Sequence, residues 1–225
     1  MDKDIKKECA KEALKLIKDN YIVGLGGGST IAHLLKLIKE SELQNIKIVT
    51  PSANTKYLCI EEGLEVLHTS SVECIDIAFD GCDQVDSNFH ALKSGGGIHT
   101  KEKLISNMAN EYVILVDESK FLTKLDYKVP VVLEIFEDAL AYIKKELKRF
   151  DVSYSIRKSV AKDGFTVTDS GNILLDLMFK DVEDSFCLEN ELNSISGVVD
   201  CSLFTKSITK ILVTSANGTV IMSRK

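Results

Sequence analysis

The sequence lacks the features that mark secreted, membrane-spanning and nucleic-acid-binding proteins. Its six cysteines include no Cys-x-x-Cys pair, which argues against a disulfide framework or a zinc site. No stretch approaches the length of a membrane span, and the charged segment 1–14 has no apolar region of the signal-peptide type. The net charge of -6 is not gathered in blocks, and its sign argues against a nucleic-acid partner. We therefore expect a cytoplasmic protein that binds neither membranes nor nucleic acids.

The positions of cysteine and histidine favour packing over metal binding. A free thiol in a helix or strand pattern usually packs as a small hydrophobic side chain. His33, His68 and His90 have no second histidine or carboxylate at ligand spacing, which argues against a metal site. The cysteines that we expect to be buried on this basis are Cys9, Cys59, Cys74 and Cys187.

Apolar periodicity in the first half predicts strands that alternate with helices. This order indicates a parallel sheet with right-handed crossovers, that is, a Rossmann-like domain. An Asn217-Gly218 turn predicts a terminal hairpin, which we expect to rejoin this domain. The predicted strands are 21–25, 46–50, 65–67, 75–79 and 112–116, and the predicted helices include 2–19 and 51–62.

The order of elements changes near residue 127. A β-α-β-β-α-β order follows, which predicts a smaller ferredoxin-like α+β domain. Pro130 within its first strand predicts an edge or a strand start, and Asp181 is expected to cap its second helix. The strands are 129–135, 152–156, 165–168, 173–178 and 197–204, with helices over 136–150 and 181–195. We therefore predict an α/β protein with domains 1–126 plus 206–225 and 127–205.

Residues 24–30, Gly-Leu-Gly-Gly-Gly-Ser-Thr, join a strand to a helix. In this geometry backbone N–H groups at the start of a helix point at an anion, and Ser29 is expected to cap the helix. The stretch is neither a Walker A loop, because no Gly-Lys-Ser/Thr ends it, nor a Gly-x-Gly-x-x-Gly motif, because Ser29 takes the third glycine position. A tight turn without a ligand remains the alternative.

Residues 80–103 gather Asp80, Asp83, Lys93, three glycines at 95–97 and Glu102 within a short stretch. The aspartates follow a buried strand, where ligands bind in open α/β sheets. A surface turn would explain one aspartate, and Glu102 alone could be a helix-dipole partner behind a Thr100 cap. Together these residues favour an acid–base enzyme that acts on an anionic substrate. Lys120 follows another strand and could bind a phosphate.

These motifs resemble, in order, those of the type A family of ribose-5-phosphate isomerases. The resemblance covers nearly the whole chain. It implies an aldose–ketose isomerase of the non-oxidative pentose phosphate pathway that interconverts D-ribose 5-phosphate and D-ribulose 5-phosphate. The family's G-x-G-T-G-S-T, D-G-A-D-E, K-G-G-G-A, R-E-K, D-x-S-K, G-N-x-x-x-D and I-x-G-V-V-x-x-G-L-F signatures are similar to residues 24–30, 80–84, 93–97, 101–103, 117–120, 171–176 and 195–204.

The resemblance implies a role for each matching residue. Glu102 is expected to be the base that moves the proton between C2 and C1. Asp80 and Asp83 would handle the hydroxyl protons and ring opening, and Lys93 would stabilise the oxyanion. No metal or organic cofactor is implied, and the family forms homodimers or homotetramers. The substrate-binding residues implied are Gly26, Gly27, Gly28, Ser29, Thr30, Gly81, Cys82, Ser94, Gly95, Gly96 and Lys120.

The sequence also departs from the family pattern, which keeps other functions open. Gly27 replaces Thr, Gln84 replaces Glu, and Ser94 replaces the first glycine of its motif. Further departures are Gly97, Lys101 and Ser202. One alternative is a sugar-phosphate sensor domain without turnover, although the chain has no room for a helix-turn-helix before Tyr21. Another is a coenzyme A transferase-like enzyme, in which Glu102 would be a covalent nucleophile.

Overall fold

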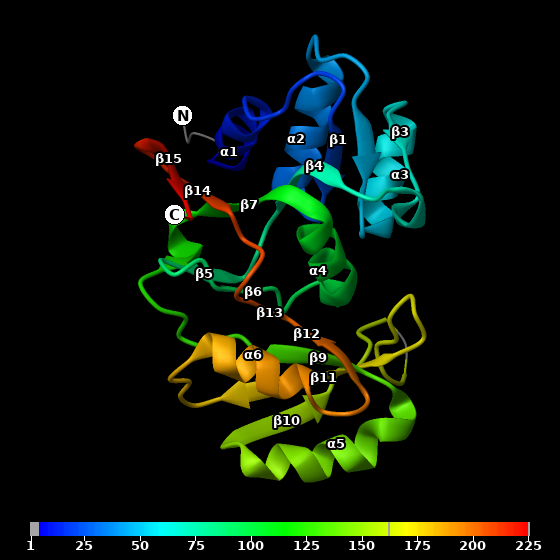
Figure 1. Ribbon diagram of the computed structural model, residues 1–225, viewed down its shortest axis with the longest axis vertical. Helices are drawn as coiled ribbons and strands as arrows, with labels where there is room; N and C mark the ends of the chain where they lie inside the picture. The colour runs from blue at the N-terminus through cyan, green and yellow to red at the C-terminus, as the bar shows by residue number, and fades with distance from the viewer. Residues whose placement is uncertain (1–4, 162, 225) are drawn as a thin grey trace. The chain divides into compact units, whose positions relative to one another are not determined.

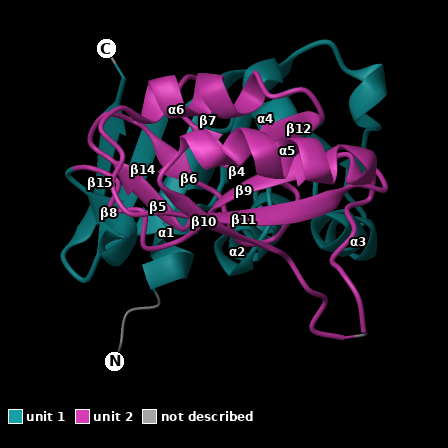
Figure 2. Ribbon diagram, turned by 90° about the horizontal axis from the view of Figure 1, so that it is seen from below, with its two compact units in different colours: residues 1–82, 101–123, 207–225 teal, residues 83–100, 124–206 magenta. Residues whose placement is uncertain are grey.

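The computed structural model describes residues 5–161 and 163–224, so the part of the first predicted helix before Ile5 lies outside the described residues. Figure 1 shows the order of its elements. The chain forms two compact units, coloured separately in Figure 2. Unit 1 comprises residues 1–82, 101–123 and 207–225, and unit 2 comprises 83–100 and 124–206.

Unit 1 is built on a seven-stranded sheet whose strand order is β15-β14-β7-β4-β1-β2-β3. Its strands pair in parallel except for the final hairpin, as the alternation of strands and helices predicted. The strands are β1 (Ile22–Leu25), β2 (Lys47–Val49), β3 (Glu65–Val66), β4 (Ile75–Asp80), β7 (Ala109–Asp117), β14 (Lys210–Ser215) and β15 (Gly218–Ser223). The predicted terminal hairpin and its return to the first sheet are confirmed.

The two faces of this sheet are covered by different helices. Val23, Leu25 and Phe79 alternate along their strands and pack with the apolar faces of α1 and α2 in one core. Gly24 and Ala78 point the other way, toward Ile105 of α4. The helices are α1 (Ile5–Leu14), α2 (Ser29–Glu40), α3 (Ala53–Glu61) and α4 (His99–Met108), and short 3-10 turns occupy Thr69–Ser71 and Glu118–Lys120, before β8 (Phe121–Leu122).

Unit 2 contains a four-stranded antiparallel sheet of order β10-β11-β9-β12. Because the chain order is β-α-β-β-α-β, this is the predicted ferredoxin-like arrangement. Its elements are β9 (Val131–Ile135), α5 (Leu140–Glu146), β10 (Val152–Ile156), β11 (Ile173–Phe179), α6 (Ser185–Asn193) and β12 (Val198–Cys201), with 3-10 turns at Glu137–Ala139 and Leu147–Arg149.

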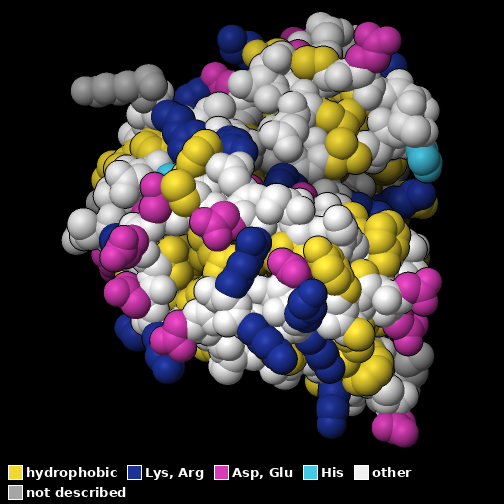
Figure 3. Space-filling model, turned by 60° about the horizontal axis from the view of Figure 1, so that its bottom comes forward, with side chains coloured by type: hydrophobic (Ala, Val, Ile, Leu, Met, Phe, Trp, Pro, Cys, Tyr) yellow, Lys and Arg dark blue, Asp and Glu magenta, His cyan; other side chains and the backbone are white. Residues whose placement is uncertain are grey.

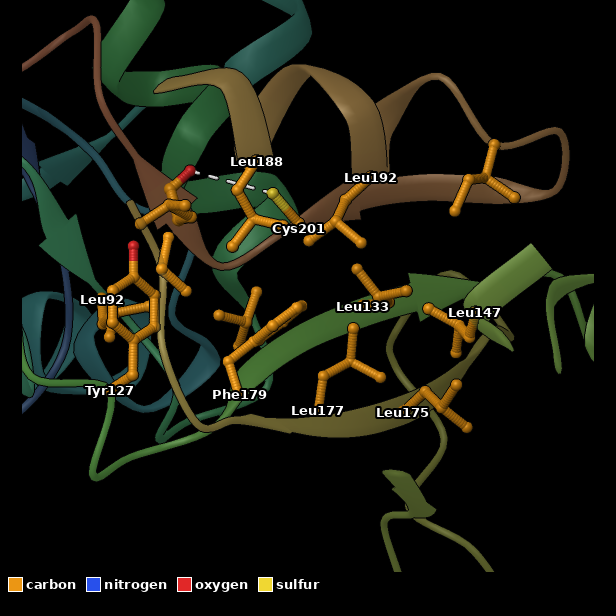
Figure 4. Packing of buried hydrophobic residues seen from close by; sticks show 14 of the residues in the cluster. Leu92, Tyr127, Leu133, Leu147, Leu175, Leu177, Phe179, Leu188, Leu192 and Cys201 are labelled. Carbon is orange, nitrogen blue, oxygen red and sulfur yellow. Dashed lines mark hydrogen bonds between the residues drawn. The ribbon is translucent and has the colours of Figure 1, made fainter. Parts of the chain in front are cut away.

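Alternation along β9 and β11 gives this sheet two distinct faces. Leu133, Leu175 and Leu177 point toward α5 and α6 and form the apolar core drawn in Figure 4. The residues between them, including Glu134 and Asp176, therefore lie on the face that the two helices do not cover. Polar side chains at these positions hold the glycine-rich segment of unit 2, as described below.

A smaller set of strands joins this unit through residues 84–92. Strands β5 (Gln84–Asp86) and β6 (Ala91–Leu92) pair with each other, and β6 pairs with β13 (Leu203–Phe204). Leu92 is fully buried in the same core as Tyr127. The structure thus groups residues 83–100 and 124–126 with unit 2, whereas the predicted domains placed them with the first domain.

Several local predictions are wrong. Of the two alternatives for Pro130, the edge strand is wrong, because β11 and β12 pair on either side of β9, whereas the strand start is confirmed, because β9 begins at Val131. Asp184, not Asp181, caps α6, accepting a hydrogen bond from the Cys187 N–H. The predicted strand 197–204 is divided between β12 and β13, and residues 165–168 contribute isolated bridges rather than a strand.

The cysteine prediction is correct for two positions of four. Cys9 and Cys59 are buried, while Cys74 and Cys187 are exposed, because Cys74 precedes its strand and Cys187 lies on the outer side of α6. Cys82 and Cys201 are buried as well, and none of the cysteines in the described part of the chain forms a disulfide bond.

Charges of both signs are interspersed with hydrophobic side chains on the face drawn in Figure 3. Tyr142, Tyr154 and Met178 are among the exposed apolar residues. Among the described residues, none of the helices combines the length and apolar character that a bilayer span requires.

Candidate active site

The first glycine turn follows β1 and leads directly into α2. The Gly26 N–H donates to the Phe79 carbonyl at 2.9 Å, and the Thr55 hydroxyl donates to the Gly26 carbonyl at 2.7 Å. A Cβ on Gly26 would lie 2.0 Å from the Asp80 carboxyl group, so this position requires glycine. Helix α2 begins at Ser29 with Gly28 as its N-cap, so the predicted cap by Ser29 is wrong. The turn therefore brings the start of α2 to the end of β4.

Asp80 is the last residue of β4, and its carboxylate is only 3% exposed. Oδ1 accepts from the Gly81 N–H at 2.8 Å and from the Gly27 N–H at 3.4 Å. Oδ2 accepts from the Tyr112 hydroxyl at 3.2 Å. These three donors fix the orientation of a buried carboxylate at the carboxyl end of a central parallel strand, where α/β sheets bind ligands.

Tyr112 on β7 was not singled out by the sequence, because a tyrosine in a strand pattern predicts only burial. Burial raises the pKa of its phenol well above the usual value, and the charges of Asp80 and Glu102 raise it further. The phenol therefore stays neutral and acts as a donor to Asp80. Glu102 lies in the first turn of α4 and is 8% exposed.

Lys120 ends the 3-10 turn that follows β7. Its ammonium donates to the Cys82 carbonyl at 2.9 Å, which draws the lysine toward the segment that follows β4. Within unit 1 the structure thus brings together Asp80, the Gly26–Gly28 turn, Tyr112 and the lysine. The sequence predicted this grouping, apart from Tyr112, from the positions of strand ends.

The second glycine turn, in unit 2, holds Asp83. Oδ2 of Asp83 accepts from the Ser94 N–H at 2.7 Å and from the Gly95 N–H at 2.9 Å. The Ser94 hydroxyl donates to the Pro130 carbonyl. Ser94, which replaces a family glycine, is therefore anchored by its side chain as well as by its backbone.

Lys93, beside this turn, is only 6% exposed. Its N–H donates to the Ser202 carbonyl at 3.0 Å, and its ammonium lies 5.9 Å from the centre of the Phe204 ring. Both partners lie at or beside strand β13. The packing of β6 against β13 thus fixes the lysine backbone.

Two further charged groups on the helix-free face of the unit 2 sheet were not predicted as functional. Arg157 contacts the carbonyls of Ser94 and Gly95. Glu134 accepts from the Thr100 hydroxyl at 2.5 Å, and from Thr168 and Asn172 at 2.8 Å each. Thr100 lies inside α4 rather than capping it, so its predicted capping role is wrong. These contacts join residues far apart in sequence, which no local pattern reveals.

Burial raises the pKa of Glu134, but the hydrogen bonds from Thr100, Asn172 and Thr168 outweigh it and hold that pKa below the ordinary value. Elsewhere in unit 2, Gln84 donates to Asp126 at 2.5 Å, so the family's glutamate position carries a structural amide here. Within residues 5–161 and 163–224, no group of three or more His, Cys, Asp or Glu side chains is arranged to hold a metal ion.

A Rossmann-like unit and a ferredoxin-like unit, each with a carboxylate oriented by backbone N–H groups, define an α/β protein equipped for acid–base chemistry. The model of the family described as ribose 5-phosphate isomerase A (phosphoriboisomerase A) matches residues 47–218. This match covers most of the chain, which therefore belongs to the ribose 5-phosphate isomerase A family.

Similar proteins cover the chain almost end to end. A ribose-5-phosphate isomerase A of Thermococcus kodakarensis is 41% identical over 98% of both chains. The structure of the Methanocaldococcus jannaschii enzyme is 35% identical, covers 98% of this chain and 99% of its own, and superposes with a TM-score of 0.91. A D-ribose-5-phosphate isomerase in complex with phospho-erythronic acid is 37% identical over 98% of both chains, with a TM-score of 0.94.

Proposed function

We propose that this protein interconverts D-ribose 5-phosphate and D-ribulose 5-phosphate. The observation that carries the proposal is full-length similarity to an isomerase whose structure holds phospho-erythronic acid, a phosphorylated sugar acid. The relatives named ribose-5-phosphate isomerase A cover the chain to the same extent. The buried carboxylates and the helix-opening glycine turn of unit 1 supply acid–base groups and an anion-binding element of the kind that this reaction needs.

The reaction moves one proton from C2 to C1 and one from O2 to O1, and it needs no external oxidant or reductant. A base removes the proton from C2 of the open-chain aldose, and the electron pair of that bond forms a C1=C2 enediolate. The proton on the C2 hydroxyl passes to O1 as the C2 carbonyl forms, and the base returns its proton to C1. Glu102 is the base in this proposal, because it is a buried carboxylate in the first turn of α4.

The aspartates and the lysine then act on the oxygen atoms. Asp80 and Asp83 transfer the hydroxyl protons and open the furanose ring, and Lys93 stabilises the oxyanion. The fixed orientation of the two aspartates supports this assignment, because proton transfer requires a positioned donor or acceptor.

The remaining predicted residues bind the phosphate and the polar ends of the sugar. In unit 1 these are the Gly26–Gly28 turn, the hydroxyls of Ser29 and Thr30, the Gly81–Cys82 segment and Lys120. Because the Gly26 and Gly27 N–H groups already donate to Phe79 and Asp80, the N–H that this turn offers the phosphate is that of Gly28. In unit 2 the N–H groups of Ser94 and Gly95 already donate to Asp83. The N–H group of Gly96 is therefore the one that binds the substrate in this proposal. This set needs no metal or organic cofactor. We propose that the protein works in the cytoplasm as a homodimer or homotetramer.

The test is isomerisation of ribose 5-phosphate in D₂O, followed by NMR with and without EDTA. The proposal expects ribulose 5-phosphate with deuterium at C1 and the same rate in both samples. Absence of turnover together with ligand-induced line broadening would overturn it in favour of a sugar-phosphate sensor. Trapping of a glutamyl thioester by hydroxylamine would instead indicate a transferase.

Glu102→Gln tests the assignment of the base. The side chain keeps its size but cannot accept a proton, so kcat should fall by about 10² to 10⁴ while KM changes little. Glu61→Gln, at an exposed carboxylate near the end of α3, is the matched control. Turnover by the Glu102 variant at the wild-type rate would remove the residue from the chemistry.

A further inference from the structure

Arg157, which the sequence did not single out, makes as many hydrogen bonds to the second glycine turn as Asp83 does. It follows β10, and its N–H donates to the Leu174 carbonyl at 2.9 Å, which continues the antiparallel ladder with β11. This register places its side chain diagonally across from Asp176 on the helix-free face of the sheet. Nε lies 3.0 and 3.2 Å from the two Asp176 oxygens, and Nη2 lies 2.6 Å from Oδ1.

The other edge of the guanidinium group contacts two consecutive carbonyls of the turn. Nη2 donates to the Ser94 carbonyl at 2.8 Å, and Nη1 donates to the Gly95 carbonyl at 2.8 Å. Gly97 closes the turn with φ of +72°, and a Cβ there would lie 2.8 Å from Leu174. These contacts hold the backbone of the turn in place beside β11.

The Ser94 carbonyl and the Gly95 N–H belong to the same peptide unit. One end of that unit accepts from Arg157, and the other end donates to Asp83 Oδ2 at 2.9 Å. A cation at the carbonyl polarises the peptide and strengthens the bond that its N–H donates. The Gly95 carbonyl and the Gly96 N–H form the next peptide unit, which receives Nη1 in the same way.

We propose that Arg157, held by Asp176, is a positioning residue for Asp83 and for the Gly96 N–H in the isomerase reaction. It fixes the two peptide units of the turn and polarises both, so that one orients the Asp83 carboxylate and the other is a strengthened donor to substrate. The proposal rests on the proposed role of Asp83. The planar guanidinium group of Arg157 has Asp176 on one edge and the Ser94 and Gly95 carbonyls on the other. A lysine ammonium cannot reproduce this arrangement.

A double-mutant cycle separates positioning through Asp83 from a general structural effect. Arg157→Gln should lower kcat by about 10- to 100-fold, because misplacement of a reacting group by about 1 Å has effects of this size. In an Asp83→Asn background the same change should lower kcat by less than about 3-fold, since the group that it positions is already lost. Additive losses, with each variant folded by circular dichroism, would overturn the proposal.

Two further variants and a control complete the test. Arg157→Lys should recover only part of kcat, and Asp176→Asn should reduce kcat in the same direction as Arg157→Gln. Arg149→Gln, at an arginine of the same unit that stacks 4.9 Å from the Phe150 ring, should leave kcat unchanged. Full recovery in Arg157→Lys would show that charge alone suffices and would contradict the proposed fork.

Amide hydrogen exchange provides a readout that does not depend on turnover. In Arg157→Gln the protection of the Ser94 and Gly95 amides should fall about 10-fold or more, while that of β9 amides stays at the wild-type level. Unchanged protection would overturn the proposal. If protection is lost in the variant but the wild-type protein does not isomerise ribose 5-phosphate, Arg157 does fix the turn and the proposed isomerase function is wrong.

Discussion

The turn at Gly26–Gly28 and the turn at Ser94–Gly97 each orient an aspartate that ends or follows strand β4, but by different means. The first admits Asp80 by lacking a side chain: Gly26 lies where a Cβ would overlap the carboxyl group. The second holds Asp83 by donating two N–H groups to it, with Arg157 behind them. Asp80 is buried beside a neutral phenol, whereas Asp83 is half-buried.

Asp80 is thus positioned mainly by steric fit, whereas Asp83 is positioned mainly by the hydrogen bonds that it accepts. A buried carboxylate surrounded by fixed donors depends on shape, since any added atom displaces it. A half-buried carboxylate can reorient, so it depends on how strongly its donors bind. The two aspartates should therefore respond differently to the same substitution.

Asp80→Asn and Asp83→Asn provide the largest test of the comparison. Both variants should lose about 10² to 10⁴ in kcat, because neither amide can exchange the substrate's hydroxyl protons. Asp80→Asn should also lose about 1–3 kcal/mol of stability, because a neutral amide replaces the charged acceptor of three hydrogen bonds at a buried position. Asp83→Asn can keep its carbonyl on the Ser94 and Gly95 N–H groups, so its urea midpoint should stay near the wild-type value. Equal destabilisation of both variants would abolish the distinction.

Gly26→Ala and Gly27→Ala test the steric half of the comparison at adjacent positions. The new Cβ of Gly26→Ala would overlap Asp80, so we expect a loss of about 1–3 kcal/mol and a displaced carboxylate. The Gly27 Cβ would meet Ser52 Oγ at 3.7 Å, an ordinary contact. Thermal unfolding should therefore show a lower Tm for Gly26→Ala and little change for Gly27→Ala. A tolerated Gly26→Ala would contradict the steric explanation.

Glu134→Gln tests whether the carboxylate that accepts from Thr100, Thr168 and Asn172 stabilises unit 2 through its charge. It replaces an acceptor of three hydrogen bonds by an amide, which should cost about 1–3 kcal/mol. Because the folded pKa of Glu134 lies below the ordinary 4.5, its contribution is complete above pH 4.5 and is lost as the pH falls through the folded value. Urea unfolding should show wild type and variant converging below that pH. If the difference in unfolding free energy between wild type and variant stays constant in acid, the loss comes from the changed shape of the side chain and not from its charge.

Tyr112→Phe should have the smallest effect. It removes the one side-chain hydroxyl that donates to Asp80 among the contacts described above, for a loss of about 0.5–1.5 kcal/mol in stability. The raised pKa of Tyr112 means that the folded state disfavours the phenolate, so its contribution is present below pH 10.0 and is lost as the pH rises further. The stability of wild type should therefore fall more steeply above pH 10 than that of the variant. Parallel slopes would contradict this.

Tyr127 of unit 2 provides an internal reference for that titration. Burial raises its pKa to about 12, although a hydrogen bond with Ser185 at 2.7 Å opposes the shift. Tyr127→Phe should flatten the alkaline slope without affecting kcat, because Tyr127 lies in the apolar core shown in Figure 4. A change in kcat would indicate a link from that core to the chemistry.

The sequence predicted the elements whose signal is local. Strand ends, glycine turns and the β-α-β-β-α-β order follow from hydrophobic period and turn chemistry, and these are confirmed. It failed where two local signals competed, as with Asp181 and Asp184 before α6. Arg157 and Glu134 were missed because a charged residue beside a strand signals only solvent exposure until its partners, 19 to 63 positions away, are known.

The chain passes between the two units after residues 82, 100, 123 and 206, and three of the four proposed catalytic residues lie within three positions of a passage. Asp80 and Asp83 stand on either side of the first passage, and Glu102 follows the second. Neither unit is therefore one continuous stretch of gene, and an exchange of unit 2 between relatives would replace Asp83 and Lys93 together with the core that supports them. Replacing unit 2 as a whole therefore requires two separate segments, residues 83–100 and 124–206, to be exchanged together.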